Sequence, residues 1–403
     1  MRRVAVTGIG LVSALGTTRD ECWRHLVAGR CGVGPLTLFE SDGYRSRIAA
    51  QVDDAAVDAA FAPVQRRRWS RSDKFALHAA REAVVDAGLS GAGYAPDRVA
   101  VFLGASTGDL FRNERYLRAA LEPASGRRRL PDAWNHFCST SVDLIATEFG
   151  FEGMRSCIVA ACASSTMSVG TALDAIRFGR ADAVLAGGTD ALARLTYSGF
   201  NALKVMDPEA CRPFDRGRNG MNIGEGAAVM VLEDLDAAKR RGARIYAEVA
   251  GHSLTCEAFH PTAPEPDGRA IAETMARALR DAKVAPDDIR HVNAHGTATP
   301  HNDRAESRGI RLVFGDAASR LPVTSIKSMV GHTLGASGGI EAAVTALSVY
   351  HGIIPPTIHH SETDPECAVD VVANEAREVP LGCVLSTSLA FGGNDAAVVL
   401  RAV

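Results

Sequence analysis

Short apolar segments alternate with amphipathic segments along the chain, and this alternation predicts strands and helices in turn. Residues 4–6 are continuously apolar, which is typical of a buried strand, and residues 20–27 predict a helix. Residues 99–104 (VAVFLG) predict another buried strand. The helix predicted before it, at 72–89, ends near Gly88 and has an apolar face made of Phe75, Ala79, Ala83 and Val84.

The same order of elements recurs in the second half of the chain. Residues 267–284 predict a helix with Ile271, Met275, Ala278 and Leu279 on one face, and APDDIRHVNAHGTAT follows it as APDRVAVFLGASTG follows the first helix. Residues 157–179 and 323–352 both predict strand, turn and helix. We therefore expect two related α/β halves, 1–242 and 243–403, joined near residues 240–245. Strands this apolar need both faces covered, so helices should lie outside buried sheets.

Composition restricts the function. The chain has 403 residues, of which 46% are hydrophobic and 23% charged, with a formal net charge of −3 and 6% aromatic residues. This argues against a nucleic-acid or anionic-membrane surface. The nine cysteines form no CxxC pair or zinc-type cluster, so we expect reduced thiols, no metal and a cytoplasmic location. The amino terminus superficially resembles a secretory signal, but Gly8 and Gly10 interrupt it, and no apolar run could span a membrane.

Cys162 is the first candidate for chemistry. It follows a strand predicted at 158–160 and precedes a helix, where unpaired N–H groups and the helix dipole favour the nucleophilic thiolate. Taken alone, the pattern fits a buried core cysteine equally well. His295 in NAHGTATPHND and His332 in KSMVGHTLGASGG also stand at strand–turn transitions, with Lys327 before His332. Sheets of this kind place their sites at strand ends, which favours one shared site.

These motifs resemble those of the elongating β-ketoacyl-acyl-carrier-protein synthases of the thiolase superfamily. The resemblance covers essentially the whole chain and rests on VTGIG (6–10), ACAS (161–164), PFDRGRNGMNIGEGA (213–227), the two histidine motifs and AFGG (390–393). It implies a thiolase-like duplicated fold, layered α-β-α-β-α. It also implies transfer of an acyl chain from the phosphopantetheine of an acyl carrier protein to Cys162, followed by decarboxylative Claisen condensation with malonyl-carrier protein. No metal or redox cofactor is required, since the malonyl group supplies the driving force.

The resemblance assigns roles residue by residue. His295 and His332 would bind malonyl-carrier protein, assist decarboxylation and stabilise the enolate, with Lys327 organising the cluster. The backbone N–H groups of Cys162 and Phe391 would form the oxyanion hole, and Phe391 would be the gating phenylalanine. The remaining positions are the pantetheine-contacting Thr297 and Thr299, the supporting acids Asp303 and Glu306, and the gating-loop residues Glu257, His260, Ala390, Gly392 and Gly393.

Several positions depart from the housekeeping fatty-acid enzymes. AFGGNDA replaces the usual GFGGTNA, Glu257 stands where aspartate is usual, and Met221 and Asn222 also differ. These changes favour a specialised synthase of the polyene or polyketide type over primary fatty-acid synthesis. Such enzymes act as homodimers or pair with a chain-length factor, a related subunit that lacks the nucleophile.

Two alternatives and one surface complete the expectations. A non-catalytic chain-length factor is disfavoured because Cys162, His295, His332 and Lys327 are all retained, and a thiolase would carry a second catalytic cysteine in the AFGG turn. A basic cluster is either a solvated face or a docking surface for an acidic carrier protein. It consists of Arg66, Arg67, Arg68, Arg71 and Lys74.

Overall fold

The computed structural model describes the chain except residues 109, 123–127, 129, 135 and 136. Its centre is an 11-stranded sheet in the order β12-β10-β9-β14-β15-β8-β1-β7-β6-β4-β5. The strands of the first half are β1 (Val4–Val12), β4 (Val99–Gly104), β5 (Arg155–Ile158), β6 (Ala183–Asp190) and β7 (Gly226–Asp234). Those of the second half are β8 (Ala247–Cys256), β9 (Ile289–Asn293), β10 (Pro322–Thr324), β12 (Asp370–Val371), β14 (Cys383–Ala390) and β15 (Asn394–Arg401).

The two halves repeat one strand topology. In the first half, β4 pairs in parallel with β5 and β6, and β7 pairs antiparallel with β6 and β1. In the second, β9 pairs in parallel with β10 and β14, and β15 pairs antiparallel with β14 and β8. The halves join where Val4–Val6 of β1 pair with Ala247–Val249 of β8. The proposed boundary, 1–242 and 243–403, falls in the connection between α10 (Leu235–Arg240) and β8.

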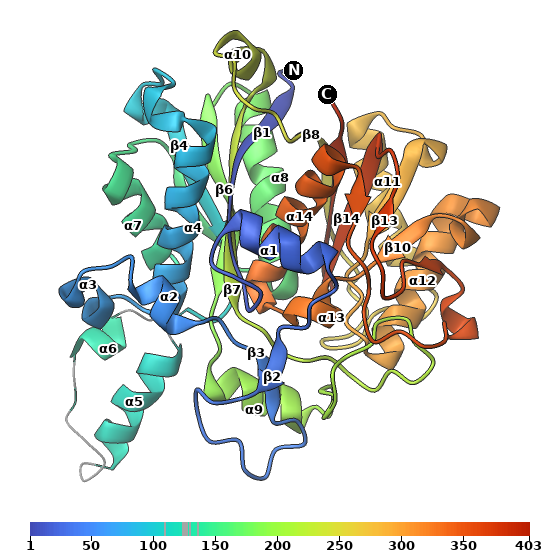
Figure 1. Cartoon of the computed structure of the whole chain (residues 1–403), viewed down its shortest axis with the longest axis horizontal. Coiled ribbons are helices and arrows are strands. Elements are labelled where there is room, and N and C mark those ends of the chain that lie inside the picture. The colour runs from blue at the N-terminus through green and yellow to red at the C-terminus, as the bar shows by residue number, and fades with distance from the viewer. Residues whose placement is uncertain (109, 123–127, 129, 135–136) are drawn as a thin grey trace.

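Helices cover the strands in layers (Figure 1). On the outer face of the first half lie α4 (Arg71–Ala87) and α7 (Thr140–Phe149), and on that of the second lie α11 (Arg269–Ala282) and α12 (Pro300–Phe314). Between the halves, α8 (Ser164–Arg177) and α14 (Ser337–His351) contact each other and strands of both. This is the expected α-β-α-β-α fold, with the strand layers of the two halves joined by hydrogen bonds into one sheet.

The remaining elements are short and flank these layers. The helices are α1 (Arg19–Val27), α2 (Asp54–Asp58), α3 (Pro63–Arg68), α5 (Leu110–Leu121), α6 (Leu130–Trp134), α9 (Arg194–Ala202) and α13 (Lys327–Val330). Two small ribbons pair β2 (Val33–Pro35) with β3 (Ile48–Ala50) and β11 (Ile353–Ile354) with β13 (Arg377–Glu378). Within the described part of the chain, every helix is too short or too polar to span a bilayer.

Glycines let helix α4 approach the sheet. A Cβ at Gly8 would lie 2.2 Å from the carbonyl oxygen of Ala83, and one at Gly10 would lie 1.8 Å from that of Ala79. The predicted apolar face of α4 is fully buried there. The glycines that interrupt the apolar amino-terminal segment are therefore sites of close packing inside β1, and the strand runs through them to Val12.

Candidate active site

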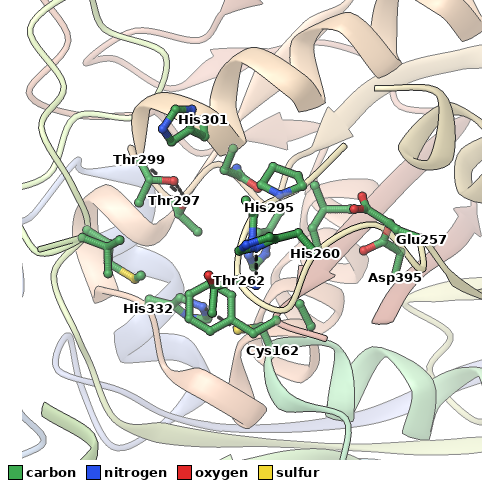
Figure 2. Close-up of a pocket in the computed structure, with 18 of the residues that line it drawn as sticks. Cys162, Glu257, His260, Thr262, His295, Thr297, Thr299, His301, His332 and Asp395 are labelled. Carbon is green, nitrogen blue, oxygen red and sulfur yellow. Dashed lines mark hydrogen bonds between the residues drawn. The ribbon is translucent and has the colours of Figure 1, made fainter. Parts of the chain in front are cut away.

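The three reactive side chains expected from the sequence meet in one cavity of about 100 Å³ (Figure 2). Cys162 comes from the first half, and His295 and His332 come from turns of the second. The thiol sulfur and one nitrogen of each imidazole lie within 4.8 Å of one another. All three residues are buried, with exposed fractions of 7%, 2% and 1%. The fold thus brings together what the chain keeps far apart.

Cys162 lies in a tight 3₁₀ turn, Ala161–Ala163, directly before α8. The strand before it ends at Ile158, two residues earlier than the sequence predicted. Ala161 adopts a φ of 48°, a left-handed conformation that costs an alanine about 1 kcal/mol. The Ser164 hydroxyl holds the turn, because it donates to the Ala161 carbonyl at 2.6 Å and accepts from the Ala160 N–H at 2.8 Å. The backbone therefore sharply reverses to present the thiol to the cavity.

Burial corrects the expectation that the helix start favours the thiolate. It raises the pKa of Cys162 to about 11, while the charge of Lys327 and the backbone N–H of Phe391 act in the opposite direction. The helix begins only at Ser164, and the loss of solvent around a sulfur anion outweighs its dipole. The free thiol is therefore protonated at neutral pH and must lose its proton as it attacks.

His332 presents an N–H group to the thiol. Its Nε2 lies 3.1 Å from the Cys162 sulfur, and the backbone N–H of Leu334 donates to its Nδ1 at 3.2 Å. A backbone N–H can only donate, so Nδ1 is the acceptor and the neutral ring carries its proton on Nε2. Burial, followed by the charge of Lys327, holds the pKa of His332 well below its usual range. The ring is neutral at pH 7 and acts as a hydrogen-bond donor.

His295 is oriented in the same way by a different group. Its Nδ1 lies 3.4 Å from Nζ of Lys327, whose ammonium donates to it, so the neutral ring carries its proton on Nε2. Burial, Lys327 and His332 hold the pKa of His295 well below its usual range. The two rings meet edge to face, with centroids 5.3 Å apart. Two imidazole N–H groups thus converge on one cavity.

Glu341 is a site residue that sequence reasoning missed. It forms an ion pair with Lys327, and both side chains are almost fully buried, with exposed fractions of 2% and 1%. Burial raises the pKa of Glu341, and Lys327 opposes this shift. The signal was present in the sequence, because Glu341 is the single charged residue in the apolar segment SGGIEAAVTALSV (337–349). A lone acid on a buried helix requires a partner.

Two buried acids hold the turn that carries His295. Glu306 accepts hydrogen bonds from the N–H groups of His295 at 2.7 Å and Gly296 at 2.8 Å. Burial raises the pKa of Glu306 to about 7, although these N–H groups pull it down. Asp303 accepts from the N–H of Ala298 at 3.1 Å. Both acids therefore stabilise the backbone conformation around His295.

The remaining expected residues lie at the cavity mouth. Thr297 and Thr299 line it, with their hydroxyl oxygens 2.9 Å apart. The Phe391 ring also lines the cavity and packs against Phe200 at a centroid distance of 5.7 Å. Other lining residues include Glu257, His260 and Ala390, whereas Gly392 and Gly393 lie in the turn between β14 and β15. Hydroxyl groups and aromatic rings thus both line this cavity.

The basic cluster divides into two parts. Arg66, Arg67 and Arg68 are exposed on α3, but the other two residues point inward. Arg71 forms ion pairs with Asp54 and Glu225, and Lys74 is 2.6 Å from Asp58. Their partners lie far away in the sequence or on a separate short helix, so sequence inspection alone could not pair them. Any docking surface here is therefore confined to α3.

The site also has the ligand types of a soft-metal site. A thiol and two neutral imidazoles within 4.8 Å of one another match the donors that zinc prefers. The sequence predicted no metal because these residues lack a compact spacing, and only the fold assembles them.

The chain is similar to known proteins over nearly its whole length. Two family models match, one described as β-ketoacyl synthase, N-terminal domain, over residues 1–238, and one as the C-terminal domain over residues 246–361. The tetracenomycin polyketide synthase ketoacyl synthase alpha subunit of Streptomyces glaucescens is 41% identical, covering 99% of this chain and 97% of that protein. The 3-oxoacyl-[acyl-carrier-protein] synthase 2 of Staphylococcus aureus (strain N315) is 36% identical, covering 99% and 98%.

The chain also superposes on solved structures over its whole length. The ishigamide ketosynthase/chain length factor superposes with a TM-score of 0.94 at 38% identity, covering 100% of this chain and 99% of that one. A type II polyketide synthase acyl-carrier protein in complex with its ketosynthase bound to the hexaketide gives a TM-score of 0.92 at 31% identity, covering 100% of both chains.

Proposed function

The chain belongs to the β-ketoacyl synthase family and is an elongating ketosynthase, and on that premise we propose that Cys162 holds the growing acyl chain of a specialised polyketide or polyene. The observation that carries this proposal is the meeting of the thiol with two N–H-donating imidazoles, the nearer one 3.1 Å from the sulfur. Such a set suits a reaction that first makes a thioester and then develops charge on an enolate oxygen.

In the proposed first half-reaction, the Cys162 sulfur attacks the carbonyl carbon of the acyl chain on its carrier protein. The new carbon–sulfur bond forms as the bond to the pantetheine sulfur breaks, and the thiol proton leaves with the pantetheine thiol. The oxyanion of the tetrahedral intermediate would be held by the backbone N–H groups of Cys162 and Phe391. The Phe391 N–H is close enough to the thiol to oppose the rise in its pKa, which suits this role.

In the second half-reaction, the malonyl unit loses CO₂ and leaves an enolate. The Nε2–H groups of His295 and His332 would donate to the enolate oxygen, and both rings are neutral at pH 7. The enolate carbon attacks the Cys162 thioester, the carbon–carbon bond forms, and the cysteine sulfur is released and takes up a proton. Thr297 and Thr299 at the mouth would hold the pantetheine arm. Carbon dioxide loss drives the step, so the proposal requires no cofactor beyond the carrier's phosphopantetheine.

Specialised metabolism is favoured over fatty-acid synthesis by the relatives. The tetracenomycin relative is 41% identical and the 3-oxoacyl synthase 36%. We further propose that an acyl carrier protein docks at α3 through Arg66, Arg67 and Arg68, whose charges would attract an acidic partner. The nine free cysteines fit the reducing cytoplasm that we propose as its location.

A second ketosynthase-like chain is the other proposed partner, either a copy of this chain or a chain-length factor. Strand β5 ends the large sheet, so one of its backbone edges is unpaired within the described chain. Exposed apolar side chains lie next to it in sequence, with Met154 exposed by 41% and Val159 by 62%. Unpaired apolar edges are sites of strand addition. Sedimentation of the chain alone and after co-expression with a candidate factor distinguishes the two partners.

The function is tested by intact-mass analysis after incubation with saturated, polyunsaturated and β-ketoacyl carrier proteins. We expect a mass gain equal to the acyl group in the wild type and none in Cys162→Ala. The matched control is Cys157→Ala, which keeps the nucleophile and should retain the mass gain. If no carrier acylates the wild type, or if Cys162→Ala is still acylated, the proposed role of this thiol is wrong. A preference for saturated chains would refute the specialised pathway alone.

A further inference from the structure

Two carboxyl groups, those of Glu257 and Asp395, lie next to each other at one side of the cavity (Figure 2). Asp395 is the second residue of β15, close to the β14–β15 turn, and its side chain is buried, with an exposed fraction of 1%. Glu257 follows the end of β8 and is half-buried. Both line the same cavity as Cys162 and Phe391. One carboxyl oxygen of Asp395, Oδ2, is buried without a hydrogen-bond partner among the described residues.

Among the described residues, none of the main electrostatic influences on this pair comes from a cation. Asp395 interacts with Glu257, with the more distant carboxyl of Glu306 on α12, and with the backbone N–H of Ala390. Glu257 faces Glu265, whose backbone N–H it accepts at 3.0 Å. His260 on the same loop turns its Nδ1 to the backbone N–H groups of Thr262 and Ala263, at 3.1 Å each. Two ionised carboxylates could not remain in contact in such a place.

A shared proton resolves this conflict. A protonated carboxyl donates one hydrogen bond, and an ionised one accepts it, so a single proton converts the contact from repulsive to attractive. Burial, followed by the charge of Glu257, raises the pKa of Asp395 to about 9, and burial raises the pKa of Glu257. The pair therefore retains one proton at neutral pH and loses it as the pH rises through about 9.

The pair connects two segments that form the cavity mouth. One is the loop 257–265, and the other is the turn 390–394 that carries Phe391. Two backbone hydrogen bonds also join them, from Glu257 N–H to Gly393 O and from Gly392 N–H to Pro261 O, at 2.8 Å each. Loss of the shared proton would set two buried negative charges against these bonds and push the segments apart.

We propose that Glu257 and Asp395 form a proton-sharing clamp that holds the loop 257–265 against the turn 390–394 and so positions Phe391 beside Cys162. The clamp rests on the proposed function of that thiol. Both acids are positioning residues, because they act through the segments they join. The clamp makes acylation of the enzyme depend on pH through a group that takes no part in the chemistry.

The test compares Asp395→Asn with the wild type between pH 8 and pH 10. The amide of asparagine donates permanently to the Glu257 carboxylate, so the variant keeps the clamp closed at alkaline pH. We measure single-turnover acylation by intact mass. Since the protonated fraction falls about tenfold over this range for a pKa of about 9, the rate ratio of Asp395→Asn to wild type should rise about tenfold. Asp267→Asn is the matched control, because Asp267 is exposed on the neighbouring segment, and its ratio should stay constant.

Infrared spectroscopy supplies a readout independent of activity. In the wild type, one component of the protonated-carboxyl stretch should disappear as the pH rises through about 9. Asp395→Asn should lack this component, whereas Asp267→Asn should retain it. A constant rate ratio, or the same carboxyl band in Asp395→Asn as in the wild type, would overturn the clamp. If no variant is acylated while the infrared band behaves as expected, the clamp stands and the proposed function fails.

Discussion

The buried ion pair between Lys327 and Glu341 offers a sharp test of why the site contains charge. Changing Glu341 to Gln keeps the side-chain shape and removes the negative charge. Two unit charges about 4 Å apart attract by about 4 kcal/mol at an effective dielectric constant of about 20. Leaving one member of a buried pair alone typically costs about 3–5 kcal/mol. We expect Glu341→Gln to lower the free energy of unfolding by about 3–5 kcal/mol, as measured by urea denaturation.

The double variant Lys327→Met/Glu341→Leu separates stability from catalysis. Replacement of a buried pair by apolar residues of similar volume is often neutral or stabilising, so the double variant should recover most of the loss. It also removes the donor that orients His295, 3.4 Å away, and condensation should fall about a hundredfold or more. Glu341→Gln with wild-type stability, or a double variant no more stable than the single one, would refute this account of the pair.

Further predictions concern packing, pH and metal ions. Gly104→Ala places a Cβ 2.2 Å from the backbone nitrogen of Ser165 at the start of α8, so it should lower both the thermal midpoint and the acylation rate. The control Gly34→Ala, which has open space around the new Cβ, should change neither. Burial lowers the pKa of His291 to about 3, and neither of its ring nitrogens has a partner among the described residues. The unfolded chain therefore binds a proton that the folded one does not, stability falls as the pH drops from about 6.5 towards 3, and His291→Leu should flatten this decline in urea midpoints. Zinc should inhibit the enzyme by binding the Cys162 thiol and both imidazoles, and a chelator should restore activity. Unchanged activity at saturating zinc would show that these three side chains do not bind the metal.

The fold could be predicted from the sequence because its signal is repeated and local. The apolar face of 72–89 appears in the structure as the buried face of α4, and residues 99–104 form β4 with the predicted bounds. The strand order of one half recurs in the other. Helix ends shifted by a few residues, since the last turns of a helix depend on capping contacts that periodicity does not contain.

The parts that could not be predicted depend on partners distant in the chain. Lys74 looked like a surface cation, but Asp58 draws it inward. The helix start at Cys162 suggested a thiolate, and only the assembled cavity shows how strongly burial opposes it. The motif AFGGNDA marks Asp395 as unusual, but its protonation depends on Glu257, which lies in the loop after β8. Local pattern identifies the residues, and tertiary contacts determine their charge.

The division of the site between two halves has a consequence for protein synthesis. The nucleophile leaves the ribosome first, and His295 is translated 133 residues later. At about 5–20 residues per second, the cysteine waits on the order of ten seconds for the groups that complete its site. During this time the nascent chain holds a thiol with neither imidazole beside it. The enzyme therefore cannot load a substrate before the second half has folded, and premature termination yields inert fragments rather than acylated ones.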